Sequence, residues 1–380
     1  MPTPVNFGFG EEEQMLRDGA RRFFAEHLPA DRLHRLVAAD HEPMRTPACH
    51  WDPAIWQQMA ALGWTAIAVP ERAGGAGMPA VAALALAEEA GRAAFPGPLV
   101  PTLQASHLLA ACGTPEADAA LARIAAGEAA TLALSDARGD WRGGTPGSEW
   151  RNGRLHGTAP WVQDARKAAF FVVKARAPSG LALLLVESGA EGLGILPDAI
   201  VDLTRDQARL RFDGAEVSAV LAEGDAARAA LAASEAALYA LVAADLCGAA
   251  EWLLQTTAEY ARVRKQFDRQ IGFFQAIKHP LVDVMMQIDQ ARSLGYEAAA
   301  AIDHEPSQAL RLAHMAKAAA AEAAGFGAGR AVQFHGGIGF TWECQVHLWF
   351  KRQLHNQMLY GDAVWHRARL ADLVLGPVGA

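Results

Sequence analysis

The spacing of apolar residues changes twice along this chain, and the two changes divide it into regions that must fold differently. In residues 11–125, apolar side chains such as Met15 and Phe23 recur at the spacing of a helix that buries one face. Helical spacing returns from about Asp225 and continues in long segments. The region between these two helical parts follows a different pattern, so the chain is not a single helical bundle.

The middle region has short apolar runs that are bounded by Gly, Pro, Asp and Ser. Runs of this length and spacing are typical of an antiparallel β domain. We therefore expect an α+β protein with a helical N-terminal domain, a middle β domain and a helical C-terminal domain, over residues 1–125, 126–222 and 223–380. The predicted strands lie in residues 131–134, 169–173, 181–186 and 208–212. Helices should be interrupted at residues 70–77 and 96–98, at Pro280, at Pro306 and at the glycines near residue 336.

Charge and cysteine content exclude several classes of function. The net charge is −8, and no block of five like charges occurs, which argues against nucleic acid or an anionic membrane as the main partner. We see no apolar run near the ~20 residues that span a bilayer and no secretory leader, so we expect a cytoplasmic protein. The four cysteines are widely spaced and form no CxxC pair, so we expect reduced thiols and no metal site.

Two segments of the C-terminal part have the composition of a ligand site. Residues 331–343 (AVQFHGGIGFTWE) place paired glycines among apolar and aromatic residues, which suggests backbone held close to a ligand. About sixty residues upstream, Arg262, Arg264 and Lys265 precede a Gln-Phe pair. A guanidinium binds a diphosphate through paired, charge-assisted hydrogen bonds, as a flavin dinucleotide requires. Arg262 taken alone is better explained by a surface salt bridge.

Together these two segments resemble the acyl-CoA dehydrogenase family. The resemblance extends over nearly the whole chain and shares its helix–sheet–helix order. It implies an N-terminal α-helical domain, a middle antiparallel β domain and a C-terminal four-helix bundle. Further matches lie in residues 56–64, 69–77 and 88–92 of the N-terminal part and in residues 157–165 and 170–173 of the centre.

The resemblance implies FAD as the cofactor and assigns residues to it. Arg264 matches the family's R-x-Q-F motif, which reaches the FAD of a neighbouring subunit. The stretch Ser135–Asp140 departs from the family's acidic, glycine-rich turn, which puts its usual flavin and acyl-CoA contacts in doubt. The residues implied to bind FAD are Ser135, Trp161, Val162, Gln163, Arg264, Gln266, Phe267, Gln275, Gln333, Gly336 and Gly337.

The family reaction removes a proton alpha to the thioester and passes the beta hydride to flavin N5, so it needs a carboxylate base. In many members the base precedes the glycine of a Y-E-G-T motif, where this chain has Tyr360. A minority place it on the first long C-terminal helix, at the position of Leu238. A further subset has an acidic residue that matches Asp245, and we predict Asp245 as the base. The alternatives are an Asp245 that is paired in a helix interface, with Glu251 or Glu235 as the base.

We therefore expect an FAD-dependent acyl-CoA dehydrogenase that acts on a bulky or branched acyl-CoA and passes electrons to an electron-transfer flavoprotein. The shared flavin of the family implies a homodimer or homotetramer, or a hetero-oligomer with a related subunit. One alternative is a non-catalytic subunit that completes a flavin site in a mixed oligomer. Another is a flavin oxidase or monooxygenase on the same fold.

Overall fold

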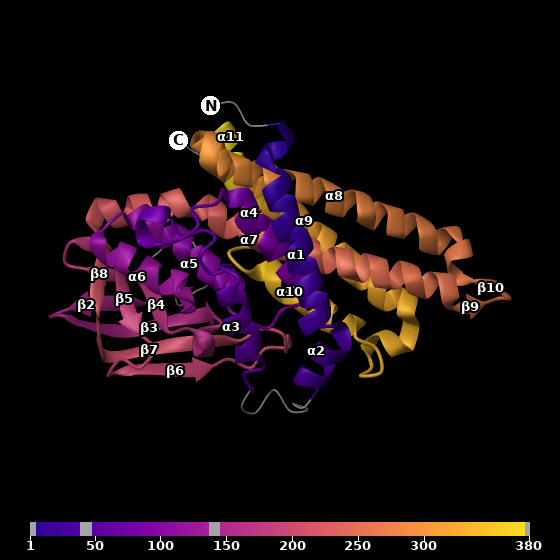
Figure 1. The fold of residues 1–380 in the computed structure, drawn as a ribbon, viewed down its shortest axis with the longest axis horizontal. Helices are drawn as coiled ribbons and strands as arrows, with labels where there is room; N and C mark the ends of the chain where they lie inside the picture. Colours follow the sequence, from indigo (N-terminus) through magenta and orange to yellow (C-terminus); the bar gives the residue numbers. More distant parts are fainter. Residues whose placement is uncertain (1–4, 39–47, 137–144, 377–380) are drawn as a thin grey trace.

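The computed structural model describes residues 5–38, 48–136 and 145–376. Its N-terminal part is helical, its middle part is a β sheet, and its C-terminal part is again helical (Figure 1). The N-terminal elements are η1 (Val5–Gly8), α1 (Glu11–His27), α2 (Ala30–Val37), α3 (Pro53–Ala61), η2 (Glu71–Ala73), α4 (Ala80–Arg92), α5 (Leu99–Cys112) and α6 (Pro115–Ala125). This part resembles the helical domain that the apolar spacing predicts.

The middle strands are β1 (Ala130–Ala133), β2 (Ser148–Arg151), β3 (Arg154–Gln163), β4 (Phe170–Ala177), β5 (Gly180–Glu187), β6 (Leu193–Pro197), β7 (Gln207–Glu216) and β8 (Ala219–Glu223), with the short helix η3 (Ala165–Lys167) after β3. They form one sheet in the order β6-β7-β3-β2-β4-β5-β8. Most neighbours are antiparallel, as predicted. However, β1 pairs with β4 in parallel, with Ala130 opposite Phe170, so the sheet is mixed.

The C-terminal part is built on long helices. Its elements are α7 (Gly224–Val263), β9 (Lys265–Gln266), β10 (Arg269–Gln270), η4 (Ile271–Phe273), α8 (Gln275–His304), α9 (Pro306–His335), η5 (Gly336–Phe340), α10 (Val346–Met358) and α11 (Ala363–Leu375). In Figure 1 the ends of α7, α8 and α9 form an arm that points away from the sheet, with β9 and β10 at its tip.

One predicted interruption of the C-terminal helices is wrong. Pro280 lies inside α8, in the second turn after the helix begins at Gln275. A proline there removes one backbone hydrogen bond, and the packing of α8 along α9 and α7 keeps the helix continuous. Pro306, in contrast, occupies the first turn of α9, where its missing N–H has no helical partner to lose.

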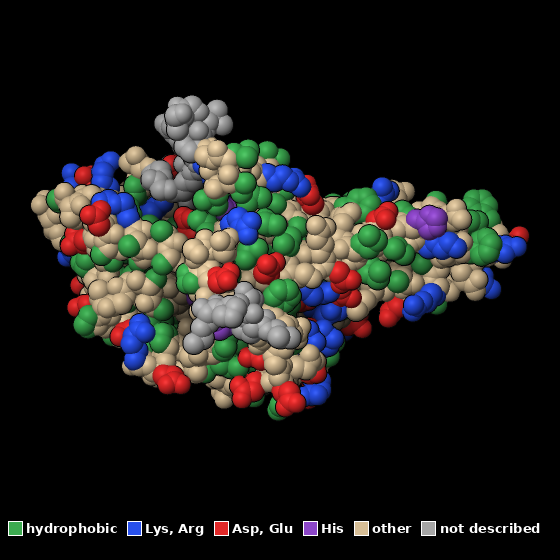
Figure 2. All heavy atoms as spheres, turned by 90° about the horizontal axis from the view of Figure 1, so that it is seen from above, with side chains coloured by type: hydrophobic (Ala, Val, Ile, Leu, Met, Phe, Trp, Pro, Cys, Tyr) green, Lys and Arg blue, Asp and Glu red, His purple; other side chains and the backbone are tan. Residues whose placement is uncertain are grey.

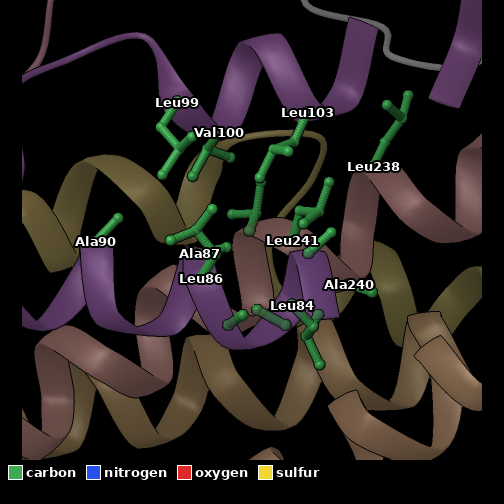
Figure 3. Packing of buried hydrophobic residues seen from close by; sticks show 14 of the residues in the cluster. Leu84, Leu86, Ala87, Ala90, Leu99, Val100, Leu103, Leu238, Ala240 and Leu241 are labelled. Atoms are coloured by element: carbon green, nitrogen blue, oxygen red, sulfur yellow. The ribbon is translucent and has the colours of Figure 1, made fainter. Parts of the chain in front are cut away.

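The helices α4, α5 and α7 share one apolar core. Figure 3 shows Leu86, Leu103 and Leu241 pointing into the space between these helices. Alanine dominates the buried positions of α4 and α7, which lets the two helices approach closely. A second apolar core lies within the sheet, around Phe171 and Leu184.

One described helix is long and apolar enough to cross a membrane by length and composition, although we expected no apolar segment of that length. It is α7, and 78% of its apolar window is buried inside the protein. A core helix of a folded domain satisfies the same test, and the contacts of α7 with α4, α5, α8 and α9 account for its apolar character.

Candidate active site

Two cavities lie on either side of the chain segment that leaves α10. Met358 and Leu359 line a cavity of about 540 Å³, and the next residue, Tyr360, lines a second cavity of the same volume. Tyr360 has a φ of 57° and Gly361 a φ of 107°, so the backbone turns sharply here. Neighbouring residues of one short segment, 358–360, therefore line two different cavities. We name the two cavities after one residue of each, the Glu235 pocket and the Trp161 pocket.

The Glu235 pocket lies between α7 and the sheet. Its apolar wall includes Leu134, Leu181, Leu231, Leu238 and Tyr239, and its charged side chains are Lys174, Arg176, Arg228 and Glu235. Leu238 and Tyr360, the two positions where the family's base is usually found, both line this pocket. Neither has a carboxylate. The Tyr360 hydroxyl instead donates to Gln104 Oε1 over 3.4 Å, and burial raises the pKa of its phenol, so it is not a base at neutral pH.

Glu235 is the carboxylate that lines this pocket. It lies three residues before Leu238 on α7, and residues at that spacing share a helix face. Burial raises the pKa of the Glu235 carboxyl, and the positive charge of Lys174 opposes the rise. A raised pKa in a largely apolar pocket is what a general base near neutral pH requires.

The Trp161 pocket lies between the edge of the sheet and α10. Trp161 projects from β3 at an irregularity, because the pairing of β3 with β7 shifts register between Ala159 and Val162. Trp161 itself has a φ of 55°. Such a bulge turns a side chain out of the regular strand alternation, here into the cavity. The remaining wall comes from Ala199, Ile200, Val201, Asp202, Gln207, Lys351, Leu354, His355, Met358 and Leu359.

A chain of side-chain hydrogen bonds crosses one side of this pocket. His355 Nε2 lies 2.8 Å from Gln163 Oε1, and Gln163 Nε2 donates to Gln207 Oε1 over 2.8 Å. Gln207 Nε2 in turn donates to Asp198. Burial lowers the pKa of His355 to about 4, so the imidazole is neutral at pH 7 and donates from Nε2 to the amide oxygen. Gln163 thus has a fixed orientation at this wall.

The other two predicted flavin contacts of the β domain lie behind the pocket wall. Ser135 is buried, and its hydroxyl donates to Pro160 O over 2.5 Å, directly before Trp161. The Val162 side chain packs inside the sheet core, so only its backbone is available to a ligand. Residues 137–140 of the predicted turn lie outside the described residues.

Asp245 has the surroundings of a structural ion-pair centre. Its carboxylate accepts two hydrogen bonds from Arg352 over 2.9 and 2.7 Å, one from Arg205 over 2.6 Å and one from Asn356 over 2.7 Å. All four side chains are buried. Burial alone would raise the pKa of Asp245, but the charges and hydrogen bonds of the two arginines outweigh it and hold the pKa below its usual range.

This geometry does not suit the role we predicted for Asp245. A base needs a free lone pair directed at a substrate, and the carboxylate of Asp245 is occupied by donors and lines neither of the two pockets. Glu251, another candidate, is ion-paired with Arg292 over 2.9 Å. The structure therefore favours Glu235, which ranked below Asp245 on sequence alone.

The remaining predicted FAD contacts lie on the arm formed by α7, α8 and α9. Tyr260, four residues before Arg264, stacks on His335 with ring centroids 4.3 Å apart, which brings the two sequence motifs together. Figure 2 shows Lys and Arg side chains toward the free end of this arm. The predicted residues Arg264, Gln266, Phe267, Gln275, Gln333, Gly336 and Gly337 are all exposed.

The predicted FAD contacts therefore form two groups. One group lies at or next to the Trp161 pocket, and the other lies on the arm that points away from the sheet (Figure 1). Each group suits a different half of FAD. At the Trp161 pocket, the flat indole of Trp161 and the amide of Gln163 suit a planar ring system. On the arm, the guanidinium of Arg264 and the exposed glycine backbone suit a diphosphate.

Comparison with known proteins places this chain in a family. Models of the acyl-CoA dehydrogenase N-terminal domain and C-terminal domain match residues 10–128 and 238–375. Acyl-CoA dehydrogenase IpdE2 of Mycobacterium tuberculosis is 32% identical over 343 residues, which cover 90% of this chain and 91% of that protein. Acyl-CoA dehydrogenase FadE34 of the same organism is 32% identical over 80% of this chain but only 39% of its own length.

Two solved structures are similar to this chain in both sequence and fold. A Tcur3481–Tcur3483 steroid ACAD variant superposes with a TM-score of 0.85 at 31% identity and covers 97% of this chain and 98% of its own. The ChsE4–ChsE5 complex of Mycobacterium tuberculosis superposes with a TM-score of 0.83 at 26% identity, over 97% of this chain and 99% of that one. This chain therefore belongs to the acyl-CoA dehydrogenase family of FAD-dependent oxidoreductases.

Proposed function

We propose that this chain catalyses the α,β-dehydrogenation of an acyl-CoA thioester bound in the Glu235 pocket, next to a flavin ring bound in the Trp161 pocket. The observation that supports the proposal is that two consecutive residues, Leu359 and Tyr360, line the two different cavities. Bound FAD supplies a hydride acceptor at flavin N5. The residues of this chain bind and orient the thioester, exclude water and remove the alpha proton.

Glu235 is the base in this proposal. Its side chain enters the pocket one helical turn before Leu238, so it reaches a thioester from the same helix that carries the base in a minority of the family. Burial raises the pKa of Glu235, which brings the proton affinity of the carboxylate closer to that of a weakly acidic alpha carbon. The apolar wall keeps water away from the ionised form.

Arg176 and Arg228 suit the phosphates of coenzyme A. Both line the Glu235 pocket and both are largely exposed, with side-chain exposures of 53% and 57%. Each pairs with an exposed carboxylate, Arg176 with Glu149 and Arg228 with Asp225. Surface pairs of this kind are weak, so a phosphate can replace the carboxylate at little cost.

We further propose a bulky or branched acyl chain as the substrate. The pocket has a volume of about 540 Å³, and leucines from β5 and α7 form much of its wall. The steroid ACAD among the similar structures provides independent support, since it covers this fold end to end. An electron-transfer flavoprotein is the acceptor that the family implies, and the cytoplasm remains the expected location.

The two separate groups of FAD contacts support an oligomer. If the arm of one subunit binds the diphosphate of an FAD whose flavin ring lies in the Trp161 pocket of another, every site contains residues of two chains. A homodimer or homotetramer satisfies this requirement, and so does a hetero-oligomer with a related subunit. The ChsE4–ChsE5 complex shows that a similar structure assembles from two named partners.

One observation favours a second function, that of a non-catalytic subunit in a mixed oligomer. Leu238 and Tyr360 leave both usual base positions without a carboxylate, so catalysis in this chain depends on Glu235 alone. A flavin oxidase or monooxygenase is a third candidate, distinguished by rapid reoxidation of the reduced flavin in air.

Anaerobic flavin bleaching tests the proposal. The purified holoprotein is mixed with straight, branched and steroid-type acyl-CoAs, and Glu235→Gln and Asp245→Asn are measured beside the wild type. We expect bleaching by a bulky acyl-CoA in the wild type and in folded Asp245→Asn, and at least a 100-fold slower rate in Glu235→Gln. Bound FAD that no acyl-CoA bleaches would show that the isolated chain is the silent subunit. Equal rates in Glu235→Gln and wild type would exclude Glu235.

A further inference from the structure

A fully buried lysine lies directly beneath the wall segment 358–360, whose residues line the two pockets. Lys317 is on α9 and has no exposed surface. Its Nζ donates one hydrogen bond to Gln357 O and one to Gly361 O, each over 3.0 Å. The first carbonyl belongs to the last turn of α10, and the second belongs to the residue after Tyr360. One ammonium group therefore joins the two ends of the segment that forms the wall.

Burying the ammonium group of Lys317 lowers the stability of the fold, so an interaction of that group must explain its presence. Within residues 5–38, 48–136 and 145–376, no carboxylate lies within ion-pair distance of Lys317 Nζ. Burial lowers the pKa of Lys317 to about 7, and the charge of Asp362 opposes the decrease. A buried cation that is compensated mainly by carbonyl oxygens destabilises a fold relative to an apolar residue of the same size. An apolar residue at this position could not form the two hydrogen bonds that Lys317 donates to the turn.

The backbone hydrogen bonds within the turn itself are long. Leu359 N donates to Asn356 O and Gly361 N donates to Met358 O, both over 3.2 Å, which is the long end of the normal range. Tyr360 is held in the left-handed region, where a non-glycine residue is strained. A segment with strained backbone and long hydrogen bonds needs support from neighbouring elements, and Lys317 supplies it from α9.

We propose that Lys317 is a positioning residue for the dehydrogenation, because it clamps residues 357–361 so that Leu359 faces the Trp161 pocket and Tyr360 faces the Glu235 pocket. The role of Lys317 in dehydrogenation rests on the proposed function. Its two hydrogen bonds to the turn do not depend on that function. Without the clamp, the wall shifts, and the distance between the thioester and the flavin ring is no longer fixed.

Hydrogen exchange of the full-length holoprotein tests the clamp without any turnover. In Lys317→Met, the amides of Leu359 and Gly361 should lose at least tenfold in protection relative to wild type. The control is Arg292→Met, which removes a half-buried cation that is paired with Glu88 and Glu251 and lines neither pocket. It should leave those two amides protected. Equal protection in Lys317→Met and wild type, or equal loss in both variants, would overturn the clamp.

A second measurement separates the clamp from general destabilisation. The protection of Leu359 and Gly361 in wild type should fall between about pH 6 and 8 as Lys317 loses its proton, because a neutral amine donates weaker hydrogen bonds. The charged and titratable groups that act on Lys317 are Asp362 on the turn and His366 on α11, and His366 in turn contacts His314 on α9. Burial lowers the pKa of His314 to about 4 and that of His366 to about 2, so neither histidine titrates in this interval.

The outcomes remain distinguishable from those of the proposed function. Loss of this pH dependence in Lys317→Met supports the clamp, and its persistence contradicts it. If Lys317→Met does not fold, Lys317→Gln takes its place, since the amide retains a donor for one carbonyl and should show intermediate protection. The bleaching rate should fall 10-fold or more in Lys317→Met with acyl-CoA affinity changed less than 3-fold. Absence of bleaching in wild type, with the exchange result as expected, would reject the proposed function and not the clamp.

Discussion

Gly248 on α7 lies directly against the backbone of Glu88 on α4. A Cβ added at Gly248 would be 1.8 Å from Glu88 O, far inside van der Waals contact. On the other side of the crossing, a Cβ on Gly91 would be 2.2 Å from Asp245 O. The two helices thus cross through a pair of glycines, and this contact fixes the part of α7 between Glu235 and the Asp245 ion-pair centre.

The crossing predicts that Gly248→Ala is strongly destabilising. The added methyl group must move the backbone of α4, and overpacking of this kind costs about 1–3 kcal/mol or more. Urea unfolding followed by circular dichroism measures the change. Gly329→Ala on α9 is the control, because nothing lies within 4 Å of its added Cβ. There, alanine should stabilise the helix by about 0.5–1 kcal/mol. Equal stability of Gly248→Ala and wild type would show that the crossing is not tight.

Asp245→Asn should destabilise the fold without removing a catalytic group. The substitution removes the ion pairs of Asp245 with the buried Arg352 and Arg205 and leaves Arg205 only a longer pair with Asp164 over 3.8 Å, and breaking a buried pair costs about 3–5 kcal/mol. The folded pKa of Asp245 is below its unfolded value, so its stabilisation is complete above the unfolded pKa and is lost as pH falls through the folded pKa. The stability gap between wild type and Asp245→Asn should therefore be widest near pH 7 and narrow in acid.

Unfolding curves at several pH values measure this gap. Glu322→Gln, which removes an exposed pair with Arg367, is the control and should change stability by less than about 1 kcal/mol. A gap that does not depend on pH would contradict the ion-pair account of Asp245.

The division into helix, sheet and helix could be predicted from sequence because it depends on local spacing. The strands β1, β4, β5 and β7 contain apolar runs and were predicted from them, whereas β3, with ten residues but no continuous apolar run, was not. The strands β2, β6 and β8 have only four or five residues, and their formation depends on neighbours in the sheet. The parallel pairing of β1 with β4 was not predicted for the same reason, since no local pattern specifies a strand's direction.

The roles of Glu235 and Asp245 could not be separated from sequence. Both are carboxylates among apolar residues of one helix, yet their ten-residue separation rotates them apart by about 80°. The partners of Asp245 are 40 and 107 residues away along the chain, at Arg205 and Arg352. Only the fold brings those arginines to Asp245 and leaves Glu235 in a pocket. Lys317 escaped notice because a single lysine in an alanine-rich helix has no local signal of burial.

Arg264→Ala should weaken FAD binding if the arm reaches a neighbouring flavin site. Hydrogen bonds to a charged group contribute about 1.5–3 kcal/mol, so the Kd for FAD should rise by about 10- to 150-fold. Fluorescence titration of the apoprotein with FAD measures the Kd. Arg262→Ala is the matched control, since Arg262 is also exposed and lies two residues before Arg264. Similar values for both variants would reject the specific role of Arg264.

The pH dependence of Glu235 provides two linked predictions. Its carboxylate must be ionised to accept the alpha proton, so the bleaching rate of wild type should rise with pH through the raised pKa of Glu235. The pKa of Glu235 is higher in the folded protein than in the unfolded chain, so protonation of Glu235 stabilises the fold. This stabilisation is complete below the unfolded pKa and is lost as the pH rises through the folded pKa. Glu235→Gln should therefore unfold at a higher urea concentration than wild type at pH 8 and at the same concentration at pH 4. Glu259→Gln, at a position on α7 that lines neither pocket, should match wild type in rate and in stability at both values. A bleaching rate that does not depend on pH, together with equal stability of Glu235→Gln and wild type at pH 8, would show that Glu235 is neither buried in its charged form nor the base.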